Sequence, residues 1–368
     1  MIRYIMFAAA LLCLLFCYLF FRIRKLLRFY GADLEKKWVK AVNALLAAGI
    51  SASCLAIFWT GAVVALYAVG CSVILDLIVF MGRKAGGAGL WAGKGFFYKL
   101  YQSGLLPVLF AAAVFVYGWQ NMRQIRLTVY QAQTEKDVTP YRIALLTDVH
   151  YDSVQDSSVL KDKIQEINEQ NVDIVVLGGD IVEEGTSKEK MQEAFQLLGG
   201  IKNRHGVYYV YGNHDRQPYT NHRTYTDEEL EQAILAGGIE ILEDSFVEIG
   251  GDLILAGRKD AAWGQTKQRA SVGEILEGAD REKYVIMADH QPVDAEENAA
   301  QGVDLELSGH THAGQIWPMG VLSEWFGALN YGEYEKDGCK VIVSSGVAGW
   351  AYTIRTGKHC EYVIVELS

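Results

Sequence analysis

The spacing of apolar residues divides this chain of 368 residues into two parts. Up to about residue 120, long apolar runs alternate with short basic segments. A run of about 20 apolar residues can cross a bilayer as a helix, so this part is expected to be an all-α transmembrane region. Beyond residue 140 the apolar runs are short, and they alternate with amphipathic segments of helical period. Such alternation predicts an α/β layered domain.

We expect about four membrane-spanning helices in the first part. Val42–Met81 is 40 residues long with Asp76 as its only charge, and a single helix of that length would be about twice as long as the hydrocarbon layer is thick. We therefore interpret it as a helical hairpin that turns near Trp59–Gly61. Asp76 is expected to face the other helices rather than to lie near the membrane surface, because further apolar residues follow it. The spans are approximately 4–21, 41–58, 61–82 and 104–119.

The basic loops predict how these helices cross the membrane. The loop Arg22–Lys40 holds seven Lys or Arg and the loop Arg83–Lys99 holds four, whereas the turn near Thr60 holds none. Positively charged loops stay in the cytoplasm, so we expect a multi-pass protein of the cell membrane with its C-terminal domain outside the cytoplasm. Arg123 and Arg126 favour the opposite orientation, and a miscounted span would reverse it. The first segment could instead be a cleaved signal peptide, but no A-x-A site follows it.

Charge separates the same two parts. Residues 1–133 hold 14 Lys and Arg against 3 Asp and Glu, whereas residues 134–368 hold 20 against 41. A basic and apolar region suits membrane lipids as partners. An acidic domain repels phosphate backbones, so no nucleic-acid partner is expected. The polar stretch 134–140 is interpreted as a linker between the transmembrane region at 1–133 and a globular domain at 141–368.

Polar clusters follow five of the predicted strands in the globular domain. Because the carboxyl ends of neighbouring strands meet in one crevice of an α/β sheet, we expect the clusters to converge. Their side chains are carboxylates, imidazoles and one carboxamide, which is the ligand set of a dinuclear transition-metal site. Each cluster alone could be a capped turn or a surface histidine, but five in this order favour metal binding. The clusters are Asp148–His150, Gly179–Asp180, Gly212–Asp215, Asp289–Gln291 and Gly309–His312.

The order of these motifs carries a family resemblance. D-x-H, G-D, G-N-H-D, a lone His after a strand and G-H-x-H together resemble the calcineurin-like metallophosphoesterase superfamily, and the sequence GHTHAGQ is similar to its bacterial membrane-associated branch. The resemblance covers about residues 141–368. It implies a four-layer α/β/β/α sandwich, in which two mixed sheets pack face to face with helices on both outer sides. It also implies metal-dependent hydrolysis of a phosphoester.

The resemblance further implies a role for each site residue. Two divalent metal ions (Mn, Fe or Zn) would hold a bridging hydroxide, and no organic cofactor is expected. His214 would protonate the leaving oxygen or stabilise charge on the phosphoryl group, and Asp215 would orient the ring of His214. The first metal ion would bind Asp148, His150, Asp180 and His312, and the second would bind Asp180, Asn213, His290 and His310.

The sequence also narrows the substrate. Protein Ser/Thr phosphatases of this superfamily read G-D-x-V-D-R-G at the second cluster, whereas Gly179–Gly185 contains no arginine. This favours a phosphodiesterase or pyrophosphatase over a phosphoprotein phosphatase. Membrane tethering favours an amphiphilic, lipid-linked or envelope phosphoester, although a tether alone does not make the substrate a lipid. The alternative function is a catalytically inactive metal-binding membrane sensor or scaffold, and the presence of both Asn213 and His214 argues against it.

One segment near the site is unusually apolar. Ile316–Tyr334 begins four residues after His312 and contains several Trp, Phe and Leu residues. The favoured interpretation is a loop that packs over the sheet. The other is a wall that admits an acyl or prenyl chain, because aromatic rings with a polar edge suit the headgroup layer.

Overall fold

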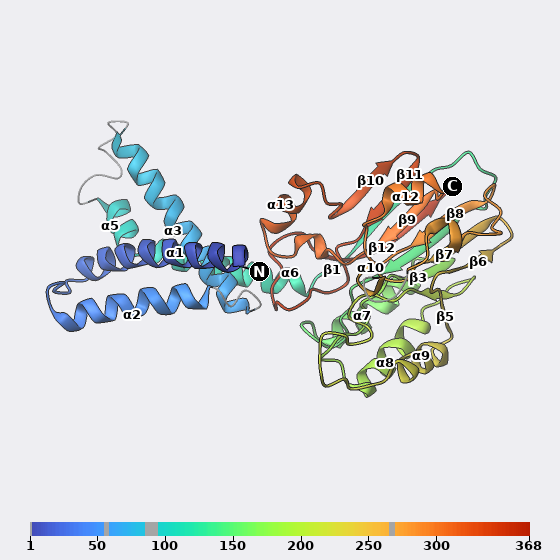
Figure 1. Ribbon diagram of the computed structural model, residues 1–368, viewed down its shortest axis with the longest axis horizontal. Helices are drawn as coiled ribbons and strands as arrows, with labels where there is room; N and C mark the ends of the chain where they lie inside the picture. The colour runs from blue at the N-terminus through green and yellow to red at the C-terminus, as the bar shows by residue number, and fades with distance from the viewer. Residues whose placement is uncertain (1, 55–58, 85–94, 265–268) are drawn as a thin grey trace. The chain divides into compact units, whose positions relative to one another are not determined.

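The computed structural model describes residues 2–54, 59–84, 95–264 and 269–368. The chain forms two compact units, Met1–Gly118 and Trp119–Ser368. The first unit is helical, and every strand among the described residues belongs to the second unit (Figure 1).

The first unit consists of apolar helices. Within the described residues, α3 and α6 are long and apolar enough to cross a membrane, as judged by length and composition. The end of the predicted span 41–58 lies outside the described residues, as does most of the loop Arg83–Lys99. The number of spans and their direction therefore stay predictions. The helices are α1 (Ile2–Phe29), α2 (Lys37–Ser53), α3 (Thr60–Lys84), α5 (Phe96–Gln102) and α6 (Leu105–Met122), the last of which continues into the second unit.

Asp76 faces other helices of the first unit, as the sequence predicts. Its carboxylate accepts hydrogen bonds from the hydroxyl groups of Tyr18 on α1 and Tyr101 on α5. The guanidinium of Arg22, which is buried, lies 3.9 Å from the same carboxylate. A buried charge is tolerated when it is paired and hydrogen-bonded, so this cluster connects α1, α3 and α5.

The second unit contains two six-stranded mixed sheets. In the first sheet β2, β3 and β4 are parallel neighbours, and in the second sheet β7, β8 and β9 are parallel neighbours. The strand order is β1-β12-β2-β3-β4-β5 in the first sheet and β10-β11-β9-β8-β7-β6 in the second. The strands are β1 (Ile125–Ala132), β2 (Tyr141–Leu146), β3 (Ile174–Leu177), β4 (Val207–Tyr209), β5 (Ile239–Ile241), β6 (Ser245–Ile249), β7 (Leu253–Gly257), β8 (Tyr284–Ala288), β9 (Leu305–Ser308), β10 (Gly332–Lys336), β11 (Cys339–Val343) and β12 (Cys360–Leu367).

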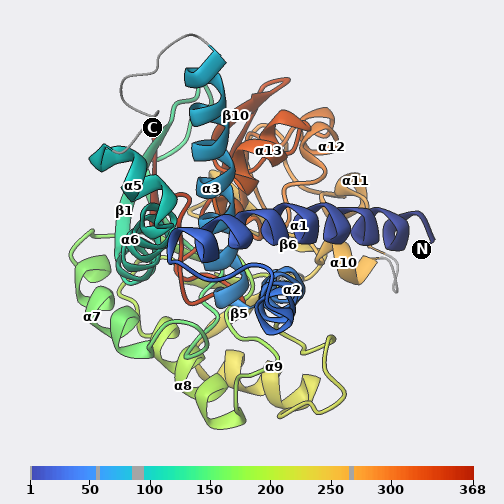
Figure 2. The same ribbon diagram turned by 90° about the vertical axis from the view of Figure 1, so that its left-hand side faces the viewer.

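Alternate residues of the central strands point into different cores. On β2, Ile143 and Leu145 belong to the core between the two sheets, whereas Ala144 and Leu146 pack with α7 (Ser157–Asn168), α8 (Lys188–Gly199) and α9 (Asp227–Ala236). These three helices lie together on one face of the unit (Figures 1 and 2). On the far side of the second sheet, a third core includes residues of α11 (Val272–Ile275) and α12 (Ala295–Ala300). This arrangement confirms the predicted α/β/β/α sandwich.

The second unit begins earlier in the chain than the linker at 134–140 suggests. β1 lies within the range 1–133 that the sequence assigns to the transmembrane region, but it pairs in parallel with all eight residues of β12. β1 is an edge strand, and only its end residues, Ile125 and Ala132, are buried. Its partner residues lie 235 positions further along the chain. The sequence around a half-exposed edge strand with so distant a partner carries no strong local pattern that predicts the strand.

This pairing predicts how truncations behave. We expect a fragment of residues 119–368 to unfold in urea at a higher midpoint than a fragment of residues 134–368. The shorter fragment lacks Met122, which is fully buried, and exposes an edge of β12 that invites aggregation. Circular dichroism and light scattering would measure both effects. Equal midpoints would show that β1 does not stabilise the sheet.

Candidate metal centre

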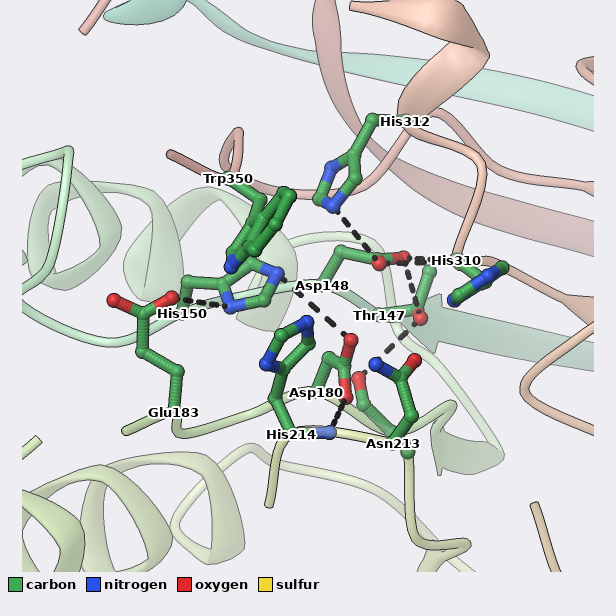
Figure 3. Close-up of polar contacts among 12 residues, drawn as sticks. Thr147, Asp148, His150, Asp180, Glu183, Asn213, His214, His310, His312 and Trp350 are labelled. Atoms are coloured by element: carbon green, nitrogen blue, oxygen red, sulfur yellow. Dashed lines mark hydrogen bonds and ion pairs between the residues drawn. The ribbon is translucent and has the colours of Figure 1, made fainter. Parts of the chain in front are cut away.

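The predicted site residues come from five strand ends and meet in one crevice, most of them drawn in Figure 3. Three of the strands belong to the first sheet and two to the second. Asp148 and His150 follow β2, Asp180 follows β3, Asn213 and His214 follow β4, His290 follows β8, and His310 and His312 follow β9.

The backbone turns sharply where these side chains enter the crevice. Positive φ angles are uncommon for residues other than glycine and cost about 1–3 kcal/mol each. Strain of this kind gathers at functional sites, where the surrounding structure holds it in place. Five of the predicted ligands have them: Asp148 (52°), His150 (40°), Asp180 (51°), His310 (67°) and His312 (48°).

Two motif glycines allow the loops to approach the carboxylates. A Cβ atom on Gly212 would lie 2.2 Å from Oδ1 of Asp180, and one on Gly309 would lie 2.3 Å from Oδ2 of Asp148. Both distances are far below van der Waals contact. The glycines of the G-N-H-D and G-H-x-H motifs are therefore required by close packing around the two carboxylates.

One group of candidate ligands consists of Asp148, His150 and His312. Their nearest donor atoms lie within 4.8 Å of one another. Nε2 of His312 is 3.4 Å from Oδ1 of Asp148, and its Nδ1 is 3.3 Å from the carbonyl oxygen of Ala348. That carbonyl can only accept, so Nδ1 carries the proton and Nε2 keeps its lone pair toward the crevice.

A second group consists of Asp180, His290 and His310, again within 4.8 Å. Nδ1 of His290 donates to the carbonyl oxygen of Gly178 at 2.8 Å, which leaves the lone pair on Nε2. This Nε2 lies 3.1 Å from Oδ2 of Asp180 but makes no hydrogen bond. Two acceptor atoms so close together repel each other unless a proton or a cation lies between them, so this pair suits ligands of one cation.

Several buried polar atoms in the crevice have no hydrogen-bond partner. They include both ring nitrogens of His150, Nε2 of His290 and Oδ1 of Asn213. A buried polar atom left unsatisfied costs about 1–3 kcal/mol. Imidazole nitrogens, a carboxamide oxygen and carboxylates all suit divalent transition metals, so the residues fit two such ions. Their assignment as metal ligands stays a prediction.

Burial and neighbouring charges shift the pKa values of the candidate ligands in different directions. Burial lowers the pKa of His312 to about 3, and burial together with the charge of His290 lowers the pKa of His310. Burial would also lower the pKa of His290, but Asp180 outweighs it and raises that pKa. Burial opposes the charge of Asp148, yet the histidines around it, His312 first, hold its pKa below the ordinary value.

The predicted partner of His214 is wrong. Nδ1 of His214 lies 2.7 Å from a carboxylate oxygen of Glu184, not of Asp215. Burial disfavours its charge, but this hydrogen bond together with the charges of Asp180 and Glu184 outweighs burial and raises the pKa of His214. Rings of Tyr219 and Trp350 lie on either side, each with a centroid 5.1 Å from the His214 ring.

Asp215 instead holds the loops that carry the ligands. One carboxylate oxygen accepts N–H groups from Asp180 (2.8 Å) and Gly212 (2.6 Å), and the other accepts from Ile181 (2.8 Å) and Val182 (3.1 Å). These amides lie beyond the strand ends and have no ladder partner, so they require a buried acceptor. Asp215 is therefore a positioning residue.

Sequence reasoning missed further positioning residues. Oε2 of Glu183 lies 3.2 Å from Nδ1 of His150. Arg355 is fully buried, and its guanidinium donates to the carbonyl oxygens of Ser345 (2.9 Å), Ala348 (2.7 Å) and His312 (3.2 Å). Glu183 and Glu184 lie three and four positions after Asp180, and this spacing was the signal in the sequence that could have identified them. Nothing local in the sequence indicates that Arg355 binds carbonyl groups rather than phosphate.

Comparison with known proteins identifies the family. A model of the calcineurin-like phosphoesterase family matches residues 141–314. An uncharacterized metallophosphoesterase from Helicobacter pylori strain J99 is 30% identical over 260 residues, which cover 68% of this chain and 67% of the relative. The chain belongs to the calcineurin-like phosphoesterase family. It is thus a metallophosphoesterase, a hydrolase of phosphoester bonds.

Two other proteins are also similar. A zebrafish (Danio rerio) protein named transmembrane protein with metallophosphoesterase domain is 26% identical over 355 residues, which cover 92% of this chain and 76% of the relative. The solved structure of TT1561 from Thermus thermophilus covers 56% of this chain and 90% of its own, with 14% identity and a TM-score of 0.39. This overall likeness is weak. The architecture is established instead by the strand order of the two sheets.

The role of Asp215 predicts a loss of stability. In Asp215→Asn an amide N–H group would face backbone N–H groups, and we expect the free energy of unfolding to fall by about 3 kcal/mol. The matched control is Asp156→Asn at the exposed N-cap of α7, where Asn caps as well as Asp. Urea denaturation would compare them. Equal small shifts in the two variants would contradict the positioning role.

Proposed function

We propose that this protein is a membrane-tethered hydrolase that cleaves phosphodiester or pyrophosphate bonds with two divalent metal ions, Mn, Fe or Zn. The observation that carries the proposal is the position of Asp180 between the two ligand groups. Its Oδ2 lies 3.1 Å from Nε2 of His290 in one group and 3.9 Å from Nε2 of His150 in the other. A single carboxylate within reach of both groups suits a bridging ligand.

The proposed ligand sets are those that the family resemblance implies, and the two groups of three residues support them. When bound, the two ions would activate a water molecule and neutralise charge on the phosphoryl oxygens. The chain's contribution is to hold the ligands at fixed places, through Asp215 and Arg355, and to keep the imidazole lone pairs directed inward. One ion would bind Asp148, His150, Asp180 and His312, and the other would bind Asp180, Asn213, His290 and His310.

His214 is suited to handle the leaving oxygen. With Nδ1 held by Glu184, the nitrogen left for the substrate is Nε2. The ring lies beside the first group, with its centroid 5.5 Å from that of His150 (Figure 3). A binding-only site has no need of a histidine oriented in this way. The arrangement therefore favours catalysis over the metal-binding sensor or scaffold.

The side chains around the ligands favour certain phosphoesters. Glu183 and Glu184 place carboxylates where the protein phosphatases of the family carry an acid and an arginine, and the guanidinium of Arg355 is engaged by carbonyl groups. A carboxylate near the phosphoryl group repels a dianion more than a monoanion. A phosphodiester or a pyrophosphate linkage therefore fits better than a phosphoprotein monoester.

The first unit supports attachment to a membrane. α3 and α6 have the length and composition of membrane spans, and a relative aligned with 92% of this chain is named a transmembrane protein. We place the protein in the cell membrane with several spans and the second unit outside the cytoplasm. That placement favours a substrate in or at the same membrane, such as a lipid-linked phosphoester, although it does not require one.

Metal dependence tests the proposed function. We expect the full chain in detergent to hydrolyse a chromogenic phosphodiester only with Mn²⁺, Fe²⁺ or Zn²⁺, and to prefer it to the corresponding monoester. Asp180→Asn should lower turnover by more than about a hundredfold, since even outer partners of metal ligands are worth about 10–100-fold. Full turnover after chelation would contradict the proposal.

A separate variant tests the role of His214. His214→Ala should lower turnover by about 10²–10⁴-fold on a diester with a poor leaving group, the range for a general acid, and by less on a nitrophenyl ester. Metal content should match that of His205→Ala, a control at an exposed histidine outside the crevice. Loss of metal from His214→Ala alone would make His214 a ligand instead.

A further inference from the structure

The short helix α13 (Met319–Trp325) presents apolar side chains to solvent. No residue of α13 is buried, and Trp325 and the following Phe326 are 81% and 86% exposed, with their rings stacked. Glu324 is the only charged residue between His312 and Glu333. The favoured interpretation of this segment as a loop packed on the sheet is therefore wrong for the helix. A cluster of exposed aromatic residues on one helix marks an interaction surface.

The backbone beneath this helix is held firmly. The side chain of Gln315 donates to the carbonyl oxygen of Ile354 (3.0 Å) and accepts the N–H of Trp350 (2.9 Å). The N–H of Trp317 donates to the hydroxyl of Thr356 at 3.0 Å. At the start of the helix, a Cβ atom on Gly320 would lie 2.6 Å from a backbone oxygen. The apolar side chains of α13 therefore project from a backbone segment that hydrogen bonds hold to the segment around Ile354 and Thr356.

The loop that holds the base of α13 also binds the end of the apolar helix α6. Within the second unit, the side-chain N–H₂ of Asn121 donates to the carbonyl oxygens of Arg355 (3.1 Å) and Lys358 (3.0 Å). The loop 354–358 therefore contacts Asn121 on one side and the base of α13 on the other. Asn121 lies two residues, or about 3 Å, beyond Trp119 in α6. If α6 spans the bilayer, this loop lies at the membrane boundary.

Cationic and aromatic residues lie beside that boundary. The guanidinium of Arg123 lies over the ring of Trp119 at 4.1 Å, and Nζ of Lys358 lies 5.3 Å from the ring centre of Tyr331. Lys and Arg beside Trp and Tyr are typical of the membrane–water interface. The rest of this unit is strongly acidic, so these cations are the part of it that an anionic lipid surface would attract.

We propose that α13, together with Trp317 and Phe326, inserts into the headgroup layer of the membrane and docks the second unit on the bilayer. This inference rests on the membrane attachment and the substrate class of the proposed function. It adds which surface of the second unit meets the membrane. α13 begins seven residues after His312, so docking places the crevice beside the lipid. An amphiphilic phosphoester would then reach the site with its acyl or prenyl chain still in the bilayer.

Photo-crosslinking of the full chain tests the docking directly. Benzoylphenylalanine is placed at Phe326 or, as the control, at Leu235, an exposed apolar residue of α9. The two proteins are reconstituted in vesicles of phosphatidylcholine and phosphatidylglycerol and irradiated. Mass spectrometry should find lipid adducts at position 326 at a yield at least about tenfold above position 235, since burial of a large side chain is worth at least about that factor.

Two results would overturn the proposal. Equal lipid yields at the two positions would show that α13 does not meet the bilayer. A crosslinked dimer of the chain from position 326, without lipid adducts, would assign this surface to a second copy. Neither readout needs catalysis, so an inactive protein would contradict the proposed function and leave the docking result intact.

Kinetic measurements test whether docking on the bilayer helps a lipid-linked substrate to reach the site. Trp325→Ala with Phe326→Ala should raise KM for a lipid-linked phosphodiester in vesicles by about tenfold and leave turnover of a soluble phosphodiester unchanged. Leu235→Ala should change neither. Equal losses on both substrates would mean that the two residues stabilise the fold, and the docking role would be wrong.

Discussion

The crevice buries two carboxylates, those of Asp148 and Asp180, where the ends of both sheets meet, and the rest of the site depends on this constraint. Neither residue is more than 1% exposed. Like charges without hydration repel each other and raise the free energy of the fold unless positive charge is supplied locally. Two divalent cations held among the surrounding imidazoles would supply it. The left-handed backbone at five ligands and the glycines at two loop tips follow from the need to bring these groups together.

Local signals in the sequence predicted an α/β layered domain with the candidate ligands at strand ends, and the family resemblance implied the sandwich. β2, β3 and β8 are mainly apolar, and within three residues of its end each is followed by a side chain of the metal-binding type. What the sequence could not decide was which partner each side chain would take. Asp215 and Glu184 are both near His214, and the unpaired amides beyond β3 and β4 bind Asp215 and leave Glu184 for the histidine. β1 was missed for a related reason, since its partner strand is the last in the chain.

The structure also links the membrane-proximal helix to the site through one residue. The carbonyl oxygen of Arg355 accepts a hydrogen bond from Asn121 at the end of α6, and its guanidinium donates to the carbonyl oxygen of His312. Arg355 is fully buried, so this link is rigid. The G-H-x-H segment, the base of α13 and the end of α6 therefore share one support.

Anomalous X-ray scattering from crystals of the purified full chain, recorded at the absorption edges of Mn, Fe and Zn, tests the dinuclear site most directly. We expect two peaks about 3.5–4 Å apart. One should lie about 2.0–2.2 Å from the nearest ligand atoms of Asp148, His150 and His312, and the other at that distance from His290 and His310, with Asp180 touching both. A single peak, or two peaks that do not share Asp180, would contradict it.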